Sequence, residues 1–80
     1  MRSMVHAYVL LTVAIGKMNS VINELNGMMC VEQLNSVTGP CDIIIKLNAD
    51  DYHELKEVVL NKIRNIDGIM GCSTSIVVDL

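Results

Sequence analysis

Apolar residues recur along the chain with two different periods, which predict alternating strands and helices. Apolar stretches rich in β-branched residues and bounded by turn residues are typical of strands. Stretches in which apolar residues return every three or four positions are typical of helices that bury one side. The predicted strands are 5–15, 31–37, 42–47 and 72–78, and the predicted helices are 17–26 and 51–66.

Each predicted helix carries one apolar stripe, and a glycine follows each of them. Gly27 ends the first helix, and Asp67 with Gly68 closes the second, as expected for residues just beyond a helix. The stripe of the first helix consists of Met18, Val21, Ile22 and Leu25, and that of the second of Tyr52, Leu55, Val59, Ile63 and Ile66.

The order of these elements, β-α-β-β-α-β, predicts an α+β fold of the ferredoxin-like type. Right-handed crossovers place both helices on one face of a four-stranded antiparallel sheet. The weakly alternating stretch 31–37 suits an edge strand, and the short turn 38–41 joins it to the next strand as a hairpin. Residues 1–80 therefore form one domain, with a core over about 5–79.

The face of the sheet that no helix covers also carries apolar residues. Alternation along the strands places Tyr8 and Leu10 from the first strand and Ile44 from the third on that open face. The chain has 80 residues, is 51% hydrophobic and only 19% charged, and domains of this size have little surplus stability. We therefore expect a homodimer formed through the open face.

Composition excludes several classes of function. The net charge of −3 and the pI near 5.1 argue against direct nucleic-acid binding, which needs clustered Lys and Arg. No apolar run reaches the roughly 18 residues that span a membrane, and no export signal is recognisable. The sequence therefore predicts a soluble, cytoplasmic protein that contacts neither membrane nor nucleic acid.

The reactive side chains do not form a recognisable catalytic or metal motif. Cys30, Cys41 and Cys72 lie far apart without a paired spacing, so we expect reduced thiols, a zinc site being the disfavoured alternative. His6 and His53 have no triad partner at a useful spacing. We expect no cofactor and no enzymatic activity, and a small ferredoxin-like enzyme using one of these histidines remains the alternative.

The segment 36–44 is the most informative part of the sequence, because it combines a glycine turn with a carboxylate where the third strand begins. Taken alone, Gly39 supplies turn backbone and Asp42 a local hydrogen bond. Together with Thr74 and Ser75, however, these residues offer a carboxylate for an ammonium group and hydroxyls for a carboxylate. Spacing leaves open whether they meet in space.

The combination of motifs along the chain resembles the ligand-binding domain of the Lrp/AsnC family, which is also called the regulation-of-amino-acid-metabolism domain. The resemblance covers residues 5–79 and is strongest at a Gly-x-x-Asp turn and at a Thr-x-Ile-Val-Val ending. The matching residues are 7–10, Val31, Val37, Thr38, Gly39, Asp42, Lys46, Leu55, Lys62, Ile63, Gly68, Ile69 and 72–78.

This resemblance implies a βαββαβ domain that dimerises sheet against sheet, rings of such dimers, and small effectors, usually amino acids, bound between dimers. Asp42 would be the polar anchor of the effector site. The positions that correspond to the family's effector-responsive residues are Ser36, Gly39, Asp42, Tyr52, Ser75, Ile76 and Val77.

The chain departs from the family pattern at two positions and in one larger feature. Cys41 stands where an aromatic residue usually precedes the aspartate, and Ile15 replaces the proline of a Pro-Gly pair. The family's N-terminal helix-turn-helix is absent from the sequence, so the chain resembles a stand-alone module that would act through effectors and mixed assembly with full-length regulators. A ligand-free assembly module, in which Asp42 only shapes the turn, remains the alternative.

Overall fold

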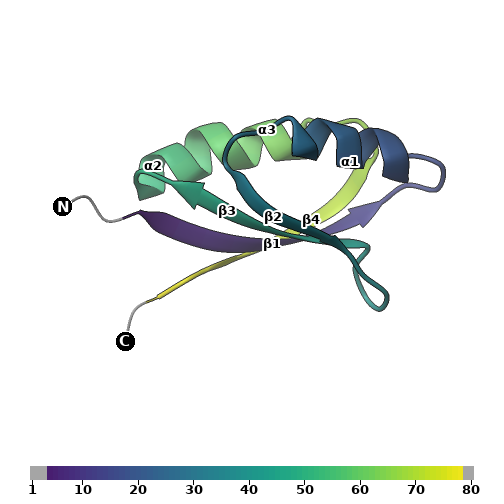
Figure 1. Cartoon of the computed structure of the whole chain (residues 1–80), viewed down its shortest axis with the longest axis horizontal. Helices are drawn as coiled ribbons and strands as arrows, with labels where there is room; N and C mark the ends of the chain where they lie inside the picture. Colours follow the sequence, from purple (N-terminus) through teal and green to yellow (C-terminus); the bar gives the residue numbers. More distant parts are fainter. Residues whose placement is uncertain (1–3, 79–80) are drawn as a thin grey trace.

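The computed structural model, which describes residues 4–78, confirms the predicted ferredoxin-like arrangement. The sheet has four strands, and Figure 1 shows that the helices of the described chain lie together on one side of it. Asp79, the last residue of the predicted core, lies outside the described residues, as do 1–3 and 80. The elements are β1 (Val5–Val13), α1 (Met18–Asn26), β2 (Val31–Ser36), β3 (Ile43–Ala49), α2 (Tyr52–Glu54), the π-helical turn η1 (Leu55–Val59), α3 (Leu60–Arg64) and β4 (Ile69–Ile76).

The sheet is antiparallel throughout, with the order β2-β3-β1-β4. β2 is therefore an edge strand, and it pairs with β3 as the predicted hairpin. In the centre, β1 and β3 pair from Val5 opposite Ala49 to Leu11 opposite Ile43. Since opposite residues lie on the same face, this register decides which side chains face the helices.

The core lies between the sheet and the helices and is built from alternate strand positions. Every second residue of β3 is buried against the helices, and the residues between them are half-buried on the open face. The predicted alternation is thus confirmed for the central strands. The least exposed large side chains of this core are Val9, Leu11, Val21, Leu25, Ile43, Ile45, Leu47, Leu55 and Ile63.

The ends of all four strands differ from the prediction, and β2 differs by a single residue, since it ends at Ser36 instead of residue 37. β1 stops at Val13 instead of residue 15, because Val13 already pairs with Ile69, the first residue of β4. β3 continues to Ala49, whose side chain is 2% exposed opposite Val5. A short apolar run does not reveal such an extension, because polar Asn48 interrupts it on the open face.

β4 was predicted over 72–78 but covers Ile69–Ile76. It starts directly after Gly68, which has a positive φ of 103° and lies so close to α1 that a Cβ there would be 2.6 Å from the Cβ of Lys17. A glycine is needed at such a backbone position. Because the chain turns at Gly68, β4 begins at Ile69, three residues before the predicted start at residue 72.

The second helix is one continuous helical run, but it is not a uniform α-helix. It begins with Asp51, whose Oδ1 accepts a hydrogen bond of 2.8 Å from the Glu54 N–H, so Asp51 caps the helix. The predicted stripe is correct at Leu55, Val59 and Ile63, which are buried, but wrong at Tyr52, whose side chain is 53% exposed. The π-helical turn η1 changes the phase of the helix, and the sequence pattern missed it.

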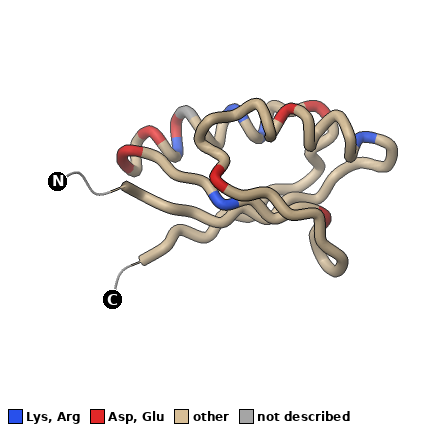
Figure 2. The backbone as a smooth tube through the Cα atoms, viewed as in Figure 1, with Lys and Arg blue, Asp and Glu red and all other residues tan. Residues whose placement is uncertain are grey.

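Charged side chains gather on the helices, whereas most of the sheet is uncharged. Figure 2 shows this distribution, with acidic positions at the start of the second helix and few charges along the strands. Within residues 4–78 no helix is long and apolar enough to cross a membrane.

Candidate functional site

The turn between β2 and β3 is held against β1 by the side chain of Asp42. The Asp42 N–H donates to the Leu11 carbonyl at 2.8 Å, and Asp42 Oδ2 accepts from the Val13 N–H at 2.8 Å. The regular pairing of β1 with β3 ends at Leu11 opposite Ile43, so the Val13 amide lies beyond the last residue pair on this side of β1. The carboxylate of Asp42 supplies the acceptor that this amide needs.

Ser36 and Gly39 lie in the same turn as Asp42. Ser36 pairs with Ile43 at the end of the hairpin, and the Val37 N–H donates to the Asp42 carbonyl at 2.9 Å. Gly39 has a φ of 118°, a conformation that requires glycine. The structure thus brings three of the predicted site residues together.

The predicted residues near the end of the chain lie elsewhere in the same protomer. Ser75 pairs with Tyr8 of β1, whereas Asp42 is bonded to Leu11, three residues further along the same strand. Ser75 and Asp42 are therefore separated by about 10 Å along the strand direction and by about 10 Å, or two strand spacings, across the sheet. Thr74, Ser75, Ile76 and Val77 and the Asp42 turn therefore do not form one pocket within a single chain.

Tyr52 is also separated from the Asp42 turn. It begins α2, after the seven residues of β3, which extend for about 23 Å. A site that combines Asp42 with Tyr52 or with Thr74, Ser75, Ile76 and Val77 therefore requires a second protomer. That combination stays a prediction.

The open face of the sheet has an apolar centre beside a polar cluster. Leu10 and Ile44 are opposite one another on β1 and β3 and are both half-buried. Tyr8 follows on β1 with its side chain 41% exposed, and the Lys46 ammonium lies 5.9 Å from its ring centroid, within the range of a cation–π contact. The open face is thus less uniformly apolar than the sequence predicts.

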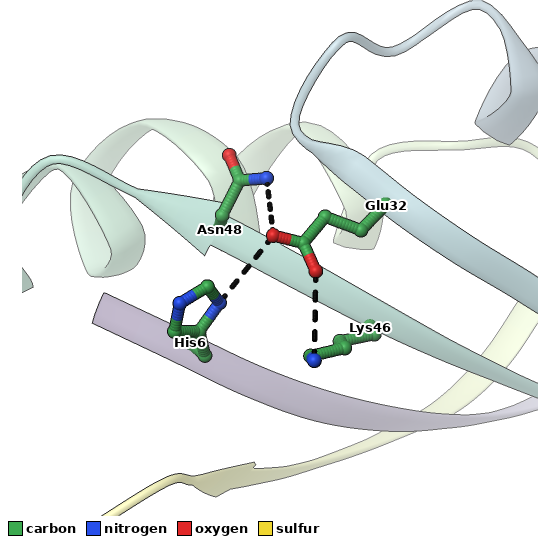
Figure 3. Close-up of polar contacts among 4 residues, drawn as sticks. All are labelled: His6, Glu32, Lys46 and Asn48. Carbon is green, nitrogen blue, oxygen red and sulfur yellow. Dashed lines mark hydrogen bonds and ion pairs between the residues drawn. The ribbon is translucent and has the colours of Figure 1, made fainter. Parts of the chain in front are cut away.

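Glu32 is the centre of the polar cluster, which consists of His6, Glu32, Lys46 and Asn48 (Figure 3). The Asn48 Nδ2 donates to Glu32 Oε1 at 2.8 Å, and the Lys46 Nζ lies 3.6 Å from Glu32 Oε2. His6 Nδ1 lies 3.4 Å from Glu32 Oε1. Within residues 4–78 this nitrogen has no hydrogen-bond partner, although it is shielded from solvent.

Hydrophobic periodicity did not predict this cluster, because Glu32 comes from a strand with a shifted register. The pairing of β2 with β3 is irregular between Val31 and Gln33, so Glu32 leaves the regular alternation. The sequence does predict part of the cluster. Strand alternation places His6 on the same face as Tyr8, and Lys46 on the same face as Asn48, which is the open face in both cases.

The cluster keeps Glu32 ionised. The hydrogen bond from Asn48 and the positive charge of Lys46 hold the pKa of the Glu32 carboxyl below its usual value of 4.5, against a smaller opposing effect of burial. A folded-state pKa below the unfolded one means that the unfolded chain binds more protons as the pH falls. The stabilisation is therefore present at neutral pH and is lost as the pH falls through the folded-state pKa.

Replacing Glu32 with glutamine should therefore alter the acid dependence of stability. We expect the wild-type chain to be more stable than the Glu32→Gln variant at neutral pH, with the difference shrinking below about pH 4.5. Urea denaturation between pH 3 and pH 7 measures this difference. Glu57→Gln, on the exposed side of the second helix, is the matched control, and an equal pH dependence of the two variants would contradict the role of Glu32.

The remaining reactive side chains are dispersed. His53 is exposed in the first turn of the second helix and His6 lies on β1, and neither histidine lines the two clefts that border Met28. All three cysteines are free thiols. Among the described residues, no three His, Cys, Asp or Glu side chains are grouped for a metal ion.

Comparison with protein families gives a match over nearly the whole chain. The family model described as the Lrp/AsnC ligand binding domain matches residues 6–79. An uncharacterised HTH-type transcriptional regulator of Pyrococcus abyssi is 34% identical over 70 residues, which are 88% of this chain and 44% of the regulator. The chain thus spans less than half the length of this curated relative.

Solved structures of similar proteins have the same fold. The crystal structure of FFRP-DM1 superposes with a TM-score of 0.88 at 32% identity and covers 92% of this chain and 99% of its own. AsnC from E. coli superposes with a TM-score of 0.87 at 26% identity over 95% of this chain and 52% of its own.

Proposed function

The chain belongs to the Lrp/AsnC ligand-binding-domain family, and from this premise we propose that it is an effector-binding and assembly module of transcription regulation. In this proposal it forms dimers through the open face of the sheet, binds an amino acid or a similar small effector between dimers, and associates with full-length regulators of the family. The observation that carries the proposal is the apolar centre of the open face beside an ordered Asp42 turn.

The open face supports the assembly part of the proposal. Leu10 and Ile44 form an apolar cross-strand pair in the middle of the sheet, and none of the helices in residues 4–78 covers this side (Figure 1). A two-layer domain gains stability when such a face is buried against another surface. The polar cluster around Glu32 borders this pair and would fix the orientation of the two sheets.

The Asp42 turn supports the effector part. Only Oδ2 of Asp42 is used by the Val13 N–H. Within residues 4–78 Oδ1 makes no hydrogen bond, so it can accept one from the ammonium group of an effector. Ser36 and Gly39 add a hydroxyl and an exposed backbone beside it. A neighbouring dimer would supply the remaining side of such a site.

Ligand screening together with mass measurement tests the proposal. Native mass spectrometry should show an even number of subunits, and at least one of the twenty amino acids should raise the melting temperature of the wild-type chain. The Asp42→Asn variant, which keeps an oxygen for the Val13 N–H, should fold and assemble but lose this shift. A monomeric wild-type chain would contradict the assembly part of the proposal.

A ligand-free assembly module is the second candidate, and the bond between Asp42 and Val13 favours it because it gives the carboxylate a structural role. Its expected result is an unchanged melting temperature with every amino acid while the subunit number stays even. The same screen therefore separates the two functions.

A further inference from the structure

A cleft that neither function uses lies on the helical side of the protomer. It lies between the α1–β2 connection, the end of β3 and the second helix, and it has a volume of about 540 Å³, within the range of small-molecule sites. It contains no residue of the Asp42 turn. The lining residues that matter here are Met28, Met29, Cys30, Glu54, Val59 and Lys62.

One wall of this cleft is apolar and rich in sulfur. Met28 is packed against the core, and Met29 is almost fully exposed beside it. Burial raises the pKa of the Cys30 thiol above its usual value, so the thiol is neutral at pH 7. Thioether and thiol groups adapt to aliphatic side chains of different shapes, so this wall suits an apolar group without demanding one shape.

The second helix places two opposite charges at the cleft. Lys62 and Glu54 both line it, and both charges act on Cys30, since Lys62 lowers the pKa of that thiol and Glu54 raises it. Within residues 4–78 the Lys62 ammonium has no ion-pair partner. From the described residues Glu54 Oε2 accepts one long hydrogen bond, of 3.4 Å, from the Asp50 N–H. Both groups are therefore able to bind a charged ligand.

The spacing of these charges limits the ligand. Glu54 and Lys62 are eight residues apart on one helical run, so their Cα atoms are separated by at most about 12 Å, the α-helical value, which the π-helical turn between them shortens. The two charges of a free α-amino acid are attached to the same carbon atom. A dipeptide extends for about 7 Å between its termini. The long side chains of Glu54 and Lys62 can bend toward each other and so bridge the rest of the distance to the two termini.

We propose that this cleft binds a short peptide of dipeptide size, with its ammonium group at Glu54, its carboxylate at Lys62 and its apolar side chains on Met28, Met29 and Cys30. The proposal goes beyond the effector function, because the cleft is complete in one protomer and contains none of the residues assigned to the effector site. Binding of the dipeptide in this cleft therefore requires neither a bound amino acid at the Asp42 turn nor a dimer.

Titration with leucyl-leucine, followed by NMR on the isotope-labelled chain, tests the proposal. We expect saturable shifts at residues 28–30, 54 and 62, and a Kd at least tenfold lower than that of free leucine. Two changes remove the contact of the ammonium group, namely N-acetylation of the dipeptide and Glu54→Gln in the protein. Two others remove the contact of the carboxylate, namely C-terminal amidation of the dipeptide and Lys62→Gln. Each of the four should raise the Kd at least tenfold. Glutamine keeps the hydrogen-bonding capacity of Glu54, so the helix start is preserved.

Pairing each blocked ligand with each variant assigns the two ends of the peptide. The acetylated dipeptide has no ammonium group that could contact Glu54. Its Kd should therefore be the same for the Glu54→Gln variant as for the wild type. Glu24→Gln and Lys56→Gln are the matched controls. Glu24 lines only the neighbouring cleft, which also contains Lys62, and Lys56 is exposed on the same helix. Both should bind like the wild type.

The outcomes also separate this proposal from the effector function. A folded monomeric variant should retain dipeptide binding, and Asp42→Asn should not change it. Equal affinity for free leucine and the dipeptide, shifts centred on the Asp42 turn, or no saturable shift would each overturn the proposal. None of these results depends on whether an amino acid raises the melting temperature through Asp42.

Discussion

Because the open face is the proposed dimer interface, an Ile44→Asp variant is expected to be a folded monomer at concentrations at which we expect the wild-type chain to dimerise. Ile44 is half-buried in the middle of the open face, opposite Leu10. In the monomer an aspartate there stays in contact with water. In a sheet-to-sheet dimer it would be buried without a partner, which costs several kcal/mol, and a two-fold interface includes the substitution twice. We therefore expect the Kd of the dimer to rise at least about 100-fold.

Sedimentation over a range of concentrations measures this Kd, and circular dichroism shows whether the variant is folded. Asn19→Asp is the matched control, because it adds the same charge at an exposed position of α1 on the helical side of the molecule. It should assemble like the wild type. A dimeric Ile44→Asp variant would show that the chains associate through another surface, such as the exposed edge of β4.

The sequence predicted the faces of the central strands well, because side-chain alternation depends only on the pleat of a strand. Ile43, Ile45 and Leu47 are all buried as expected, and Ile44 lies on the open face. Strand ends were predicted less well. They depend on where a partner strand runs and on single backbone positions such as Gly68, whose close approach to Lys17 has no signature in hydrophobic periodicity.

The same distinction applies to the functional residues. The turn around Gly39 and Asp42 is a local feature, and the sequence located it. The contact of Asp42 with Val13 joins residues 29 positions apart, and the cluster around Glu32 joins three strands with an irregular pairing. Contacts of this kind depend on register, which a single sequence does not specify where strands shift.

The proposed assembly surface and the proposed peptide cleft lie on opposite sides of one small domain. The open face of the sheet has few charges, whereas the helical side carries the acidic start of the second helix (Figure 2). Assembly through the sheet would leave the cleft beside Lys62 accessible. The Asp42 turn lies at one end of the sheet, where it contacts β1.

Replacing Asp42 with alanine should therefore destabilise the chain even without any ligand. The Val13 N–H is partly buried and bonds to Asp42 Oδ2 at 2.8 Å, and removal of this acceptor leaves the amide unsatisfied, which costs about 1–3 kcal/mol. For a domain of this size the melting temperature should fall by about 5–20 °C. Urea denaturation and thermal unfolding measure the loss.

Asp42→Asn separates the structural role of this side chain from its proposed role in effector binding. The amide oxygen of asparagine can still accept the Val13 N–H, so we expect a loss of less than about 1 kcal/mol, the difference between a neutral and a charge-assisted hydrogen bond. The negative charge that would bind an ammonium group is gone, however. If the asparagine variant is as unstable as the alanine variant, the charge of Asp42 rather than its acceptor oxygen stabilises the turn, and loss of ligand binding in either variant would then reflect a damaged fold.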